Sequence, residues 1–277
     1  MPEAPELHAG VDALVPAEIA RKAETVGAEK VRMDFWRLMV LAILAGAFIG
    51  LGAMFATTVM SGAGDTVPYG VSRLLGGLVF CLGLVLVVLG GAELFTGNML
   101  MTMALASGKV RMAEMLRAWA IIYVGNFIGA VGLAGLVFLS GQYEFGGGSV
   151  ARAALDIATA KVALSFMQAL LLGVLCNLLV CLAVWLALGA RSAADKVLAV
   201  LFPVSAFVAA GFEHSVANMY FVPLGLFIAA AQSLDLPGLT WGAFALSLIP
   251  VTIGNIIGGA VLVGVVYWFV YLRGREA

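Results

Sequence analysis

The chain has 277 residues, of which 63% are hydrophobic and only 11% are charged, and its mean hydropathy is +1.08. Soluble domains carry about a quarter charged residues, so this composition excludes an ordinary soluble protein and predicts a polytopic helical membrane protein. The formal net charge of −1 gives no reason to expect a nucleic-acid partner.

The N-terminal residues 1–37 are polar and mixed in charge, unlike the short apolar core of a secretory signal peptide. We expect them to form a cytoplasmic tail that ends in an interfacial helix at about Pro16–Arg37. The predicted membrane channel domain is 38–272, and residues 273–277 form a second cytoplasmic tail.

Six membrane spans are predicted, because crossing the hydrocarbon core of a bilayer takes roughly 20 apolar residues. In chain order they are about Leu38–Met60, Ser72–Ala106, Ala118–Leu139, Val162–Leu188, Val197–Ala231 and Trp241–Leu272. Polar residues interrupt the second span at Glu93–Asn98 and the fifth span at Gly211–Asn218. These two interruptions predict helices that are broken inside the membrane.

The cysteines Cys81, Cys176 and Cys181 lie in apolar runs, without a Cys-x-x-Cys pair or the spacing of metal ligands. We expect them to be packing residues, and the sequence predicts neither a metal nor a cofactor.

The basic residues predict the orientation, since six spans place both termini on one side. Of the 15 Lys and Arg residues, 12 fall on the side of the termini, and only Arg73, Arg152 and Lys161 fall on the other. The positive-inside rule then places both termini in the cytoplasm. We expect a multi-pass protein of a bacterial-type inner membrane.

The two interrupted spans resemble each other. Gly91–Met99 and Gly211–Met219 share Gly, Glu, Asn and Met at matching positions, and Gly125–Val131 in the third span resembles Gly254–Val261 in the sixth. Each half therefore contains a span, a broken span and a span with Gly-Asn. With three spans per half, the second copy is inverted, as in many transporters whose site lies where broken helices meet.

The polar residues at the breaks have a structural explanation and a functional one. Lipid cannot satisfy the backbone groups that a broken helix frees, so side chains must do so. Candidates for this supporting role are Glu93, Asn98, Glu213, Asn218, Thr96 and Ser215. A charge at mid-membrane costs about 2.5–3.5 kcal/mol or more, so we expect each glutamate to be paired or neutral.

His214 is the candidate for chemistry, because the only other histidine is His8 in the tail. A lone histidine is usually a satisfied core residue, but an imidazole in a broken membrane helix can pass a proton to a bound anion. We expect His214 to line a pathway and to face Thr96 from the other break. By default, Lys161 is an anchor that reaches the membrane interface, but it could also attract anions to an outer vestibule.

Four segments in order carry a specific resemblance: Ala92–Asn98, Asn177–Trp185, Gly211–Met219 and Pro250–Gly259. They resemble the signatures of the formate/nitrite transporter family. The resemblance implies an aquaporin-like, all-α fold of two inverted three-helix repeats, with helices 2 and 5 broken at mid-membrane. It also implies a homopentamer with one pore per protomer and transport of small monovalent anions such as formate, nitrite or hydrosulfide.

Matched by motif, the resemblance implies roles for individual residues. It places His214 and Thr96 at the pore centre, with Asn177 beside them and Lys161 in the outer vestibule. Glu213 and Asn255 would orient the central polar groups. The apolar constrictions would be formed by Phe80, Leu84 and Phe207, with Leu94 and Phe95 near the cytoplasmic one. From their sequence context alone, Phe80, Leu84 and Phe207 would be core or lipid-facing residues.

The substrate is less well defined than the family. The first break, Glu93–Asn98, is closer to the nitrite type, whereas the fourth to sixth spans resemble formate channels more. We therefore favour formate, with nitrite or hydrosulfide as alternatives. In the mechanism we favour, His214, helped by Thr96, protonates the anion so that a neutral acid crosses the apolar rings, since burying an unpaired charge costs far more.

Three other classes fit less well. An aquaporin-like channel for neutral solutes would carry Asn-Pro-Ala at both breaks, but Asn98 and Asn218 each precede a methionine. An intramembrane zinc protease would need His-Glu-x-x-His, and Glu213-His214 has no second ligand nearby. A structural scaffold would not need Glu, His and Asn at mid-depth. We therefore do not expect an enzyme.

Overall fold

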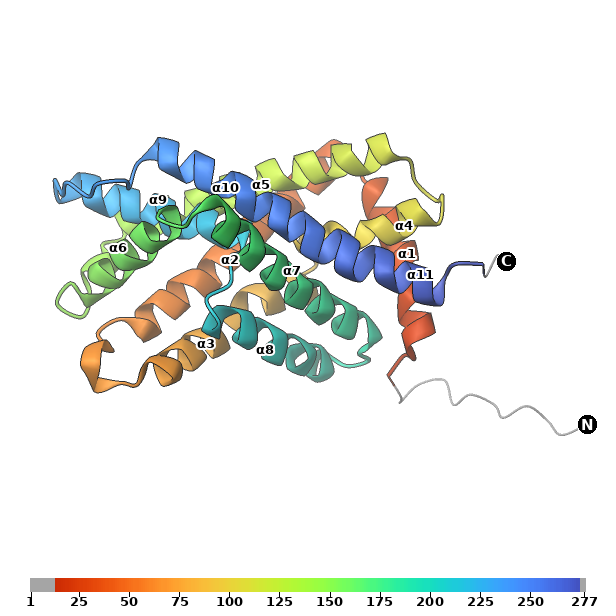
Figure 1. Ribbon diagram of the computed structural model, residues 1–277, viewed down its shortest axis with the longest axis horizontal. Helices are drawn as coiled ribbons and strands as arrows, with labels where there is room; N and C mark the ends of the chain where they lie inside the picture. The colour runs from red at the N-terminus through yellow and green to blue at the C-terminus, as the bar shows by residue number, and fades with distance from the viewer. Residues whose placement is uncertain (1–12, 275–277) are drawn as a thin grey trace, which may run out of the picture.

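The computed structural model describes residues 13–274, and this part of the chain is helical (Figure 1). His8 and the rest of 1–12 lie outside the described residues, as do 275–277. The helices of the first half are α1 (Pro16–Val31), α2 (Phe35–Met60), η1 (Gly64–Thr66), α3 (Tyr69–Gly90), η2 (Gly97–Met101), α4 (Thr102–Ala106), α5 (Met112–Leu139) and η3 (Gln142–Glu144). Those of the second half are α6 (Ser149–Val162), α7 (Phe166–Gly189), α8 (Ala193–Ala209), α9 (Ser215–Ala231), α10 (Trp241–Ile256), the π-helix η4 (Ile257–Val265) and α11 (Val266–Tyr271).

The predicted six-span architecture is confirmed. Five segments of the described chain are long and apolar enough to cross a membrane, namely α2, α3, α5, α7 and the continuous segment Trp241–Tyr271. The remaining predicted span is divided into α8 and α9, which are 17 residues each. The fifth span is therefore broken as the sequence predicts, and the second is broken between α3 and η2.

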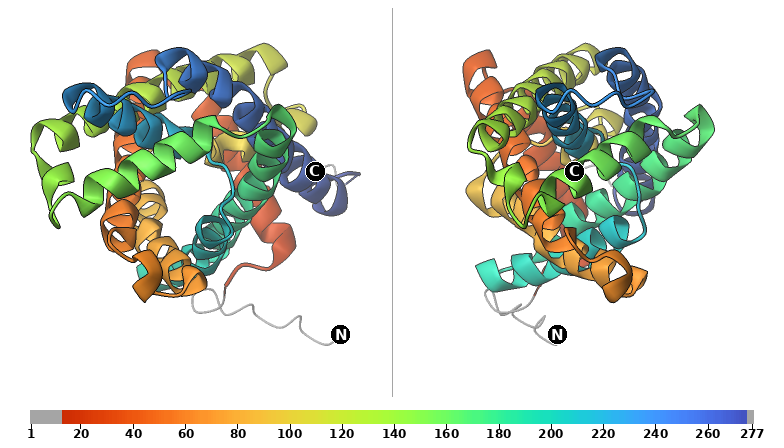
Figure 2. Two further views of the ribbon diagram at one scale, coloured as in Figure 1. Left: turned by 60° about the vertical axis from the view of Figure 1, so that its left-hand side comes forward. Right: turned by 90° about the vertical axis from the view of Figure 1, so that its left-hand side faces the viewer.

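The two halves have the same order of elements and opposite orientations. A helix, α1 or α6, precedes a long helix, a broken pair and a second long helix in each half. Figure 1 shows α1 and α6 at opposite ends of the molecule, while α11 lies at the same end as α1. Figure 2 shows from two further directions that α3 and α8, the first parts of the two broken helices, lie side by side.

Glycines let the long helices of each half approach closely, as in other membrane helix pairs. A Cβ atom on Gly129 of α5 would overlap the carbonyl oxygen of Ile43 in α2. In the second half, a Cβ on Gly258 would overlap the carbonyl oxygen of Val174 in α7. At both points the backbones are too close for any side chain. These two contacts hold the long helices of each half together around the breaks.

Helix caps move several boundaries away from the predicted ones. The fourth span begins at Phe166 and not at Val162, because Ser165 caps α7 by accepting from the Gln168 N–H at 3.4 Å. Lys161, which directly precedes the predicted start of this span, lies in the last turn of α6. The predicted interfacial helix at Pro16–Arg37 ends at Val31, and Asp34 caps the start of α2.

The contact at Gly129 yields a stability prediction. Gly129→Ala should lower the free energy of unfolding by about 1–3 kcal/mol, because the added methyl group forces α2 and α5 apart. Gly132→Ala is the matched control on the same helix, since open space surrounds Gly132. Thermal unfolding in detergent measures both, and equal stability of the two variants would contradict the close approach.

Candidate functional site

The two breaks end their helices in the same way. Gly91 and Gly211 adopt left-handed conformations, with φ of 74° and 75°. The next residue in each loop bonds back to the helix, from the Ala92 N–H to the Val87 carbonyl and from the Phe212 N–H to the Phe207 carbonyl, both at 3.0 Å. This is the Schellman pattern, which a glycine at that position favours.

A buried asparagine from the last membrane span of each half, Asn126 of α5 or Asn255 of α10, holds each break. The Asn126 Oδ1 atom accepts from the Phe95 N–H at 2.8 Å, and its amide donates to the carbonyls of Ala42 at 2.7 Å and Glu93 at 2.9 Å. Asn126 and its counterpart in the second half, Asn255, are both 0% exposed. These side chains satisfy backbone groups that lipid cannot reach.

Asn255 repeats this arrangement in the second half. Its Oδ1 atom accepts from the Ser215 N–H, and its amide donates to the carbonyls of Gly173 and Glu213, all at 2.9 Å. Asn255 was among the residues predicted at the site, and Asn126 was not. The signal for Asn126 was present in the Gly-Asn repeat that the two positions share.

Each glutamate at a break is paired with a lysine and an asparagine. The Lys30 Nζ lies 2.9 Å from the Glu93 Oε2, and Asn98 donates to the same oxygen at 2.8 Å. A buried carboxylate needs such partners, because an unpaired charge in apolar surroundings is costly. Lys30 was not among the predicted site residues.

The second half has the same three groups. The Lys161 Nζ lies 2.9 Å from the Glu213 Oε1, and Asn218 donates to the Glu213 Oε2 at 2.7 Å. Lys30 and Lys161 each precede the first residue of a long helix, Phe35 or Phe166, by five positions. That spacing was the sequence signal that would have identified Lys30.

His214 connects the two breaks and also caps α9. Its Nε2 lies 2.9 Å from the Thr96 Oγ1, and its Nδ1 accepts from the Ala217 N–H at 3.1 Å. A ring nitrogen that accepts carries no proton, so the neutral imidazole has its proton on Nε2 and donates it to Thr96. This cap restarts the helix at Ser215, and the predicted break up to Asn218 is therefore too long.

Three cavities of the described chain share lining residues, the smallest with each of the two larger ones. The first, which we call the Lys161 vestibule, has a volume of about 380 Å³, and its lining includes Arg73, Phe80, Lys161, Phe207, Glu213 and His214. The second, the Lys30 vestibule, has a volume of about 250 Å³, and its lining includes Lys22, Lys30, Leu84, Glu93, Leu94 and Lys196. The third is a central void of about 10 Å³.

The central void shares side chains with each vestibule, and these side chains, apolar except for His214, form a constriction between the vestibules. Phe80, Phe207 and His214 line both the void and the Lys161 vestibule, while Leu84 and Leu94 line both the void and the Lys30 vestibule. The rings of Phe80 and Phe207 meet edge to face with centroids 5.7 Å apart. A volume of about 10 Å³ is close to that of one water-sized probe, so the passage is nearly closed here.

Three of the residues predicted to line the pathway lie outside the lining of these cavities, as do the supporting residues Asn218 and Asn255. Thr96 is fully buried and contacts His214. The Asn177 amide donates to the Thr96 carbonyl at 3.2 Å and to the Asn255 carbonyl at 2.6 Å. Phe95 packs against Tyr123, with ring centroids 4.8 Å apart. These residues contact the groups that hold the breaks in place.

The charges differ between the vestibules. The charged residues that line the Lys30 vestibule are three lysines, Lys22, Lys30 and Lys196, and one carboxylate, Glu93. Those that line the Lys161 vestibule are two basic residues, Arg73 and Lys161, and two acidic residues, Asp156 and Glu213. Burial lowers the pKa of Lys22, and the nearby charges of Lys196 and Arg191 lower it further. Positive charge gathered at an opening raises the local concentration of anions.

Within residues 13–274, no group of three or more His, Cys, Asp or Glu side chains is arranged to hold a metal ion. The three cysteines are buried and free.

The inverted repeat and the two vestibules, separated by an apolar constriction, define a channel-type membrane transporter. The sequence model of the formate/nitrite transporter family matches residues 17–269, and the chain belongs to this family. It is accordingly a transporter and not an enzyme.

Curated relatives and solved structures agree with this family. The formate channel FocA of Escherichia coli K12 is 41% identical over 281 residues, covering 96% of this chain and 97% of the relative. FocA of Haemophilus influenzae is 36% identical, covering 91% and 93%. A solved pentameric formate channel with formate bound has a TM-score of 0.79 and 43% identity, covering 86% of this chain and 98% of that one.

The paired glutamate of the second break yields a further stability prediction. Lys161→Met should destabilise the protein by about 3–5 kcal/mol, because it leaves Glu213 buried without its cation. Adding Glu213→Gln should restore most of this loss, since the uncompensated charge is then gone. Unfolding in detergent measures both variants, and a double variant no more stable than the single one would be inconsistent with this explanation.

Proposed function

We propose that the chain is a formate channel in which a central histidine controls passage. The observation that carries this proposal is the single imidazole, His214, in an apolar constriction between two lysine-bearing vestibules. Formate is favoured because the relatives and the solved structure described above are formate channels by name.

The geometry favours a small monovalent species that changes its charge during passage. Lysines in the vestibules attract anions, but Phe80, Phe207, Leu84 and Leu94 offer no partner to a bare charge. Moving an unpaired anion past such groups costs far more than moving its neutral acid. A weak acid that is protonated at the constriction avoids that cost.

The hydrogen bonds of His214 suggest how protonation is controlled. The neutral ring holds one proton on Nε2, and a second proton must enter at Nδ1, where the Ala217 N–H now donates. Protonation of His214 therefore displaces the cap of α9. We infer that proton delivery to the anion is coupled to a local loosening of the first turn of α9, with Thr96 holding the ring in place.

Nitrite and hydrosulfide remain alternative substrates, because both are small monovalent anions with neutral acids. The Glu93–Asn98 motif of the first break favours nitrite, and the later spans favour formate. Relative fluxes of the three anions distinguish these substrates.

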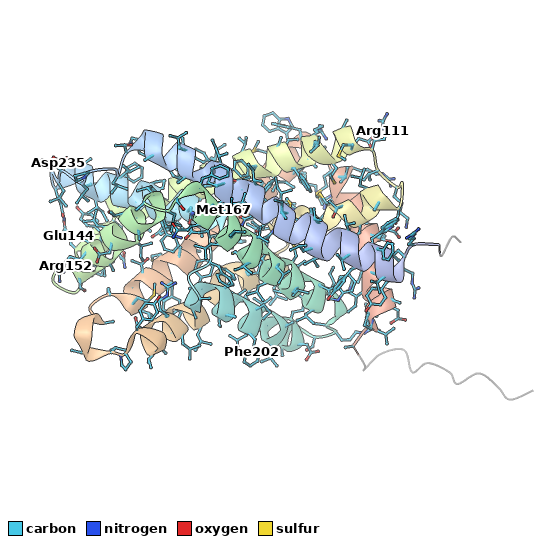
Figure 3. All side chains as sticks on the ribbon, viewed as in Figure 1. Arg111, Glu144, Arg152, Met167, Phe202 and Asp235 are labelled. Carbon is cyan, nitrogen blue, oxygen red and sulfur yellow. The ribbon has the colours of Figure 1, made fainter. Side chains whose placement is uncertain are left out.

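The assembly and orientation are also proposals. A solved relative is pentameric, and we propose that this chain forms a homopentamer in a bacterial inner membrane. Large apolar side chains are exposed on the helices, such as Phe202 of α8, which is 74% exposed and points away from the bundle (Figure 3). Such residues suit contact with lipid or with a neighbouring protomer.

The role of His214 is tested by two substitutions that separate its two functions. Asparagine is a good helix N-cap but cannot deliver a proton near neutral pH, whereas phenylalanine can neither cap the helix nor deliver a proton. His214→Asn should keep the thermal stability of the wild type and lower formate flux at pH 5 about a hundredfold, the lower range for general acid–base catalysis. His214→Phe should lose stability as well.

Formate flux into liposomes at pH 5 and pH 7 and unfolding in detergent provide the two measurements. If His214→Asn kept a wild-type pH dependence of formate flux, histidine would have no part in proton delivery.

The orientation is tested by single cysteines at opposite ends of the molecule. Arg111 and Asp235 lie at opposite ends in Figure 3, and the three native cysteines are buried. In intact cells, a membrane-impermeant maleimide should label Asp235→Cys from outside and label Arg111→Cys only after lysis. The reverse pattern would place the termini outside the cytoplasm.

A further inference from the structure

Arg73 of α3 binds the C-terminal end of α8 directly before the second break. Its Nη2 donates to the Val208 carbonyl, and its Nε donates to the Ala209 carbonyl at 3.4 Å. The last carbonyls of a helix have no partner within the helix, and their end carries a partial negative charge. An arginine, whose donors are arranged in a fork, suits such a pair of carbonyls.

The two hydrogen bonds from Arg73 to the end of α8, which we call the Arg73 clamp, act next to the constriction. Phe207, whose side chain forms one wall of the constriction, directly precedes Val208, whose carbonyl accepts from Arg73. Phe80, the opposite wall, lies on α3 seven residues after Arg73, which is about two helical turns and places both residues on one face. Arg73 therefore ties the helix that carries Phe80 to the helix end that carries Phe207.

Arg73 extends the antiparallel contact between α3 and α8 to the last turn of α8. A Cβ on Gly77 would lie 2.6 Å from the Ser205 carbonyl oxygen, so the two backbones already touch there. Beyond Ser205 the chain reaches Gly211, whose left-handed conformation ends the helix. Arg73 packs directly over this turn, because its Nη2 would lie 3.6 Å from a Cβ on Gly211.

The internal repeat shows that the clamp belongs to one break only. The offset of 120 residues between Gly91 and Gly211 matches Arg73 with Ala193 in the second half. Alanine has no donor to offer the end of α3. The two breaks therefore share asparagine, glutamate and lysine partners, but the arginine is specific to the break that holds His214.

We propose that Arg73 is a positioning residue that holds Phe207 against Phe80 and thereby sets which carboxylates pass. This inference rests on the proposed formate-channel function. Formate has no carbon beyond its carboxyl carbon, whereas acetate carries a methyl group that needs more room at the constriction. Releasing the end of α8 widens the constriction and admits the larger acid.

The experiment compares formate and acetate permeability in liposomes for the wild type, Arg73→Gln and Arg73→Lys. Lysine keeps the charge but is a point donor that does not reproduce the fork. Both variants should raise the acetate-to-formate permeability ratio about tenfold or more, the effect expected from losing hydrogen bonds by a charged donor. Arg152→Gln is the control, because Arg152 is an exposed arginine on the neighbouring α6 and lines none of the three cavities.

A second comparison tests whether Arg73 acts through Phe207. Phe207→Ala alone should also raise the ratio, and the combination of Phe207→Ala with Arg73→Lys should raise it no further. Coupled residues give such non-additive effects, whereas independent residues add.

The outcomes separate the two proposals. If Arg73 serves only to attract anions, Arg73→Gln will raise the KM for formate without changing the acetate-to-formate permeability ratio, and Arg73→Lys will have the KM of the wild type. That result would overturn the positioning role. Additive effects with Phe207→Ala overturn it as well. Wild-type liposomes without formate flux would instead refute the proposed function itself.

Discussion

The structure depends on one constraint, which is that a helix broken in apolar surroundings must find partners for the backbone groups it frees. The protein meets this constraint twice with the same set of side chains. Asn126 and Asn255 bond to the backbone of the two loops, and the carboxylates of Glu93 and Glu213 are each held by an asparagine and a lysine. Each set draws on several helices of its own half, so the breaks are fixed only in the folded protein.

The two breaks are nearly symmetric, and the residues that differ between them lie beside the constriction. The position in the first break that matches His214 is Leu94, so the passage has one imidazole and not two. The lysines differ as well. Lys30 also donates to the Asn98 Oδ1 at 3.1 Å, whereas the Lys161 Nζ lies 5.5 Å from the ring centroid of Phe221. A symmetric frame that holds one titratable ring at its constriction suits a solute that gains or loses a proton on the way.

Much of this arrangement was predictable, because membrane depth makes polar residues conspicuous. The six spans, both breaks and the facing of His214 and Thr96 follow from hydropathy and from the repeat. Lys30, Arg73 and Asn126 were missed as site residues for a physical reason. Each acts on an element distant in the sequence, and a lysine or arginine near a span end is ordinarily an interfacial anchor. The second break was predicted too long, because hydropathy does not reveal that an imidazole can cap a helix.

We propose that the two breaks form one passage for a small anion and its acid. The most direct test is uptake of formate, nitrite, hydrosulfide and glycerol into liposomes that carry the wild-type protein, at pH 5 and pH 7. We predict saturable formate flux that is faster at pH 5, with little or no glycerol flux. Glycerol uptake without flux of any of the three anions would contradict this account and would indicate a neutral-solute channel in the same frame.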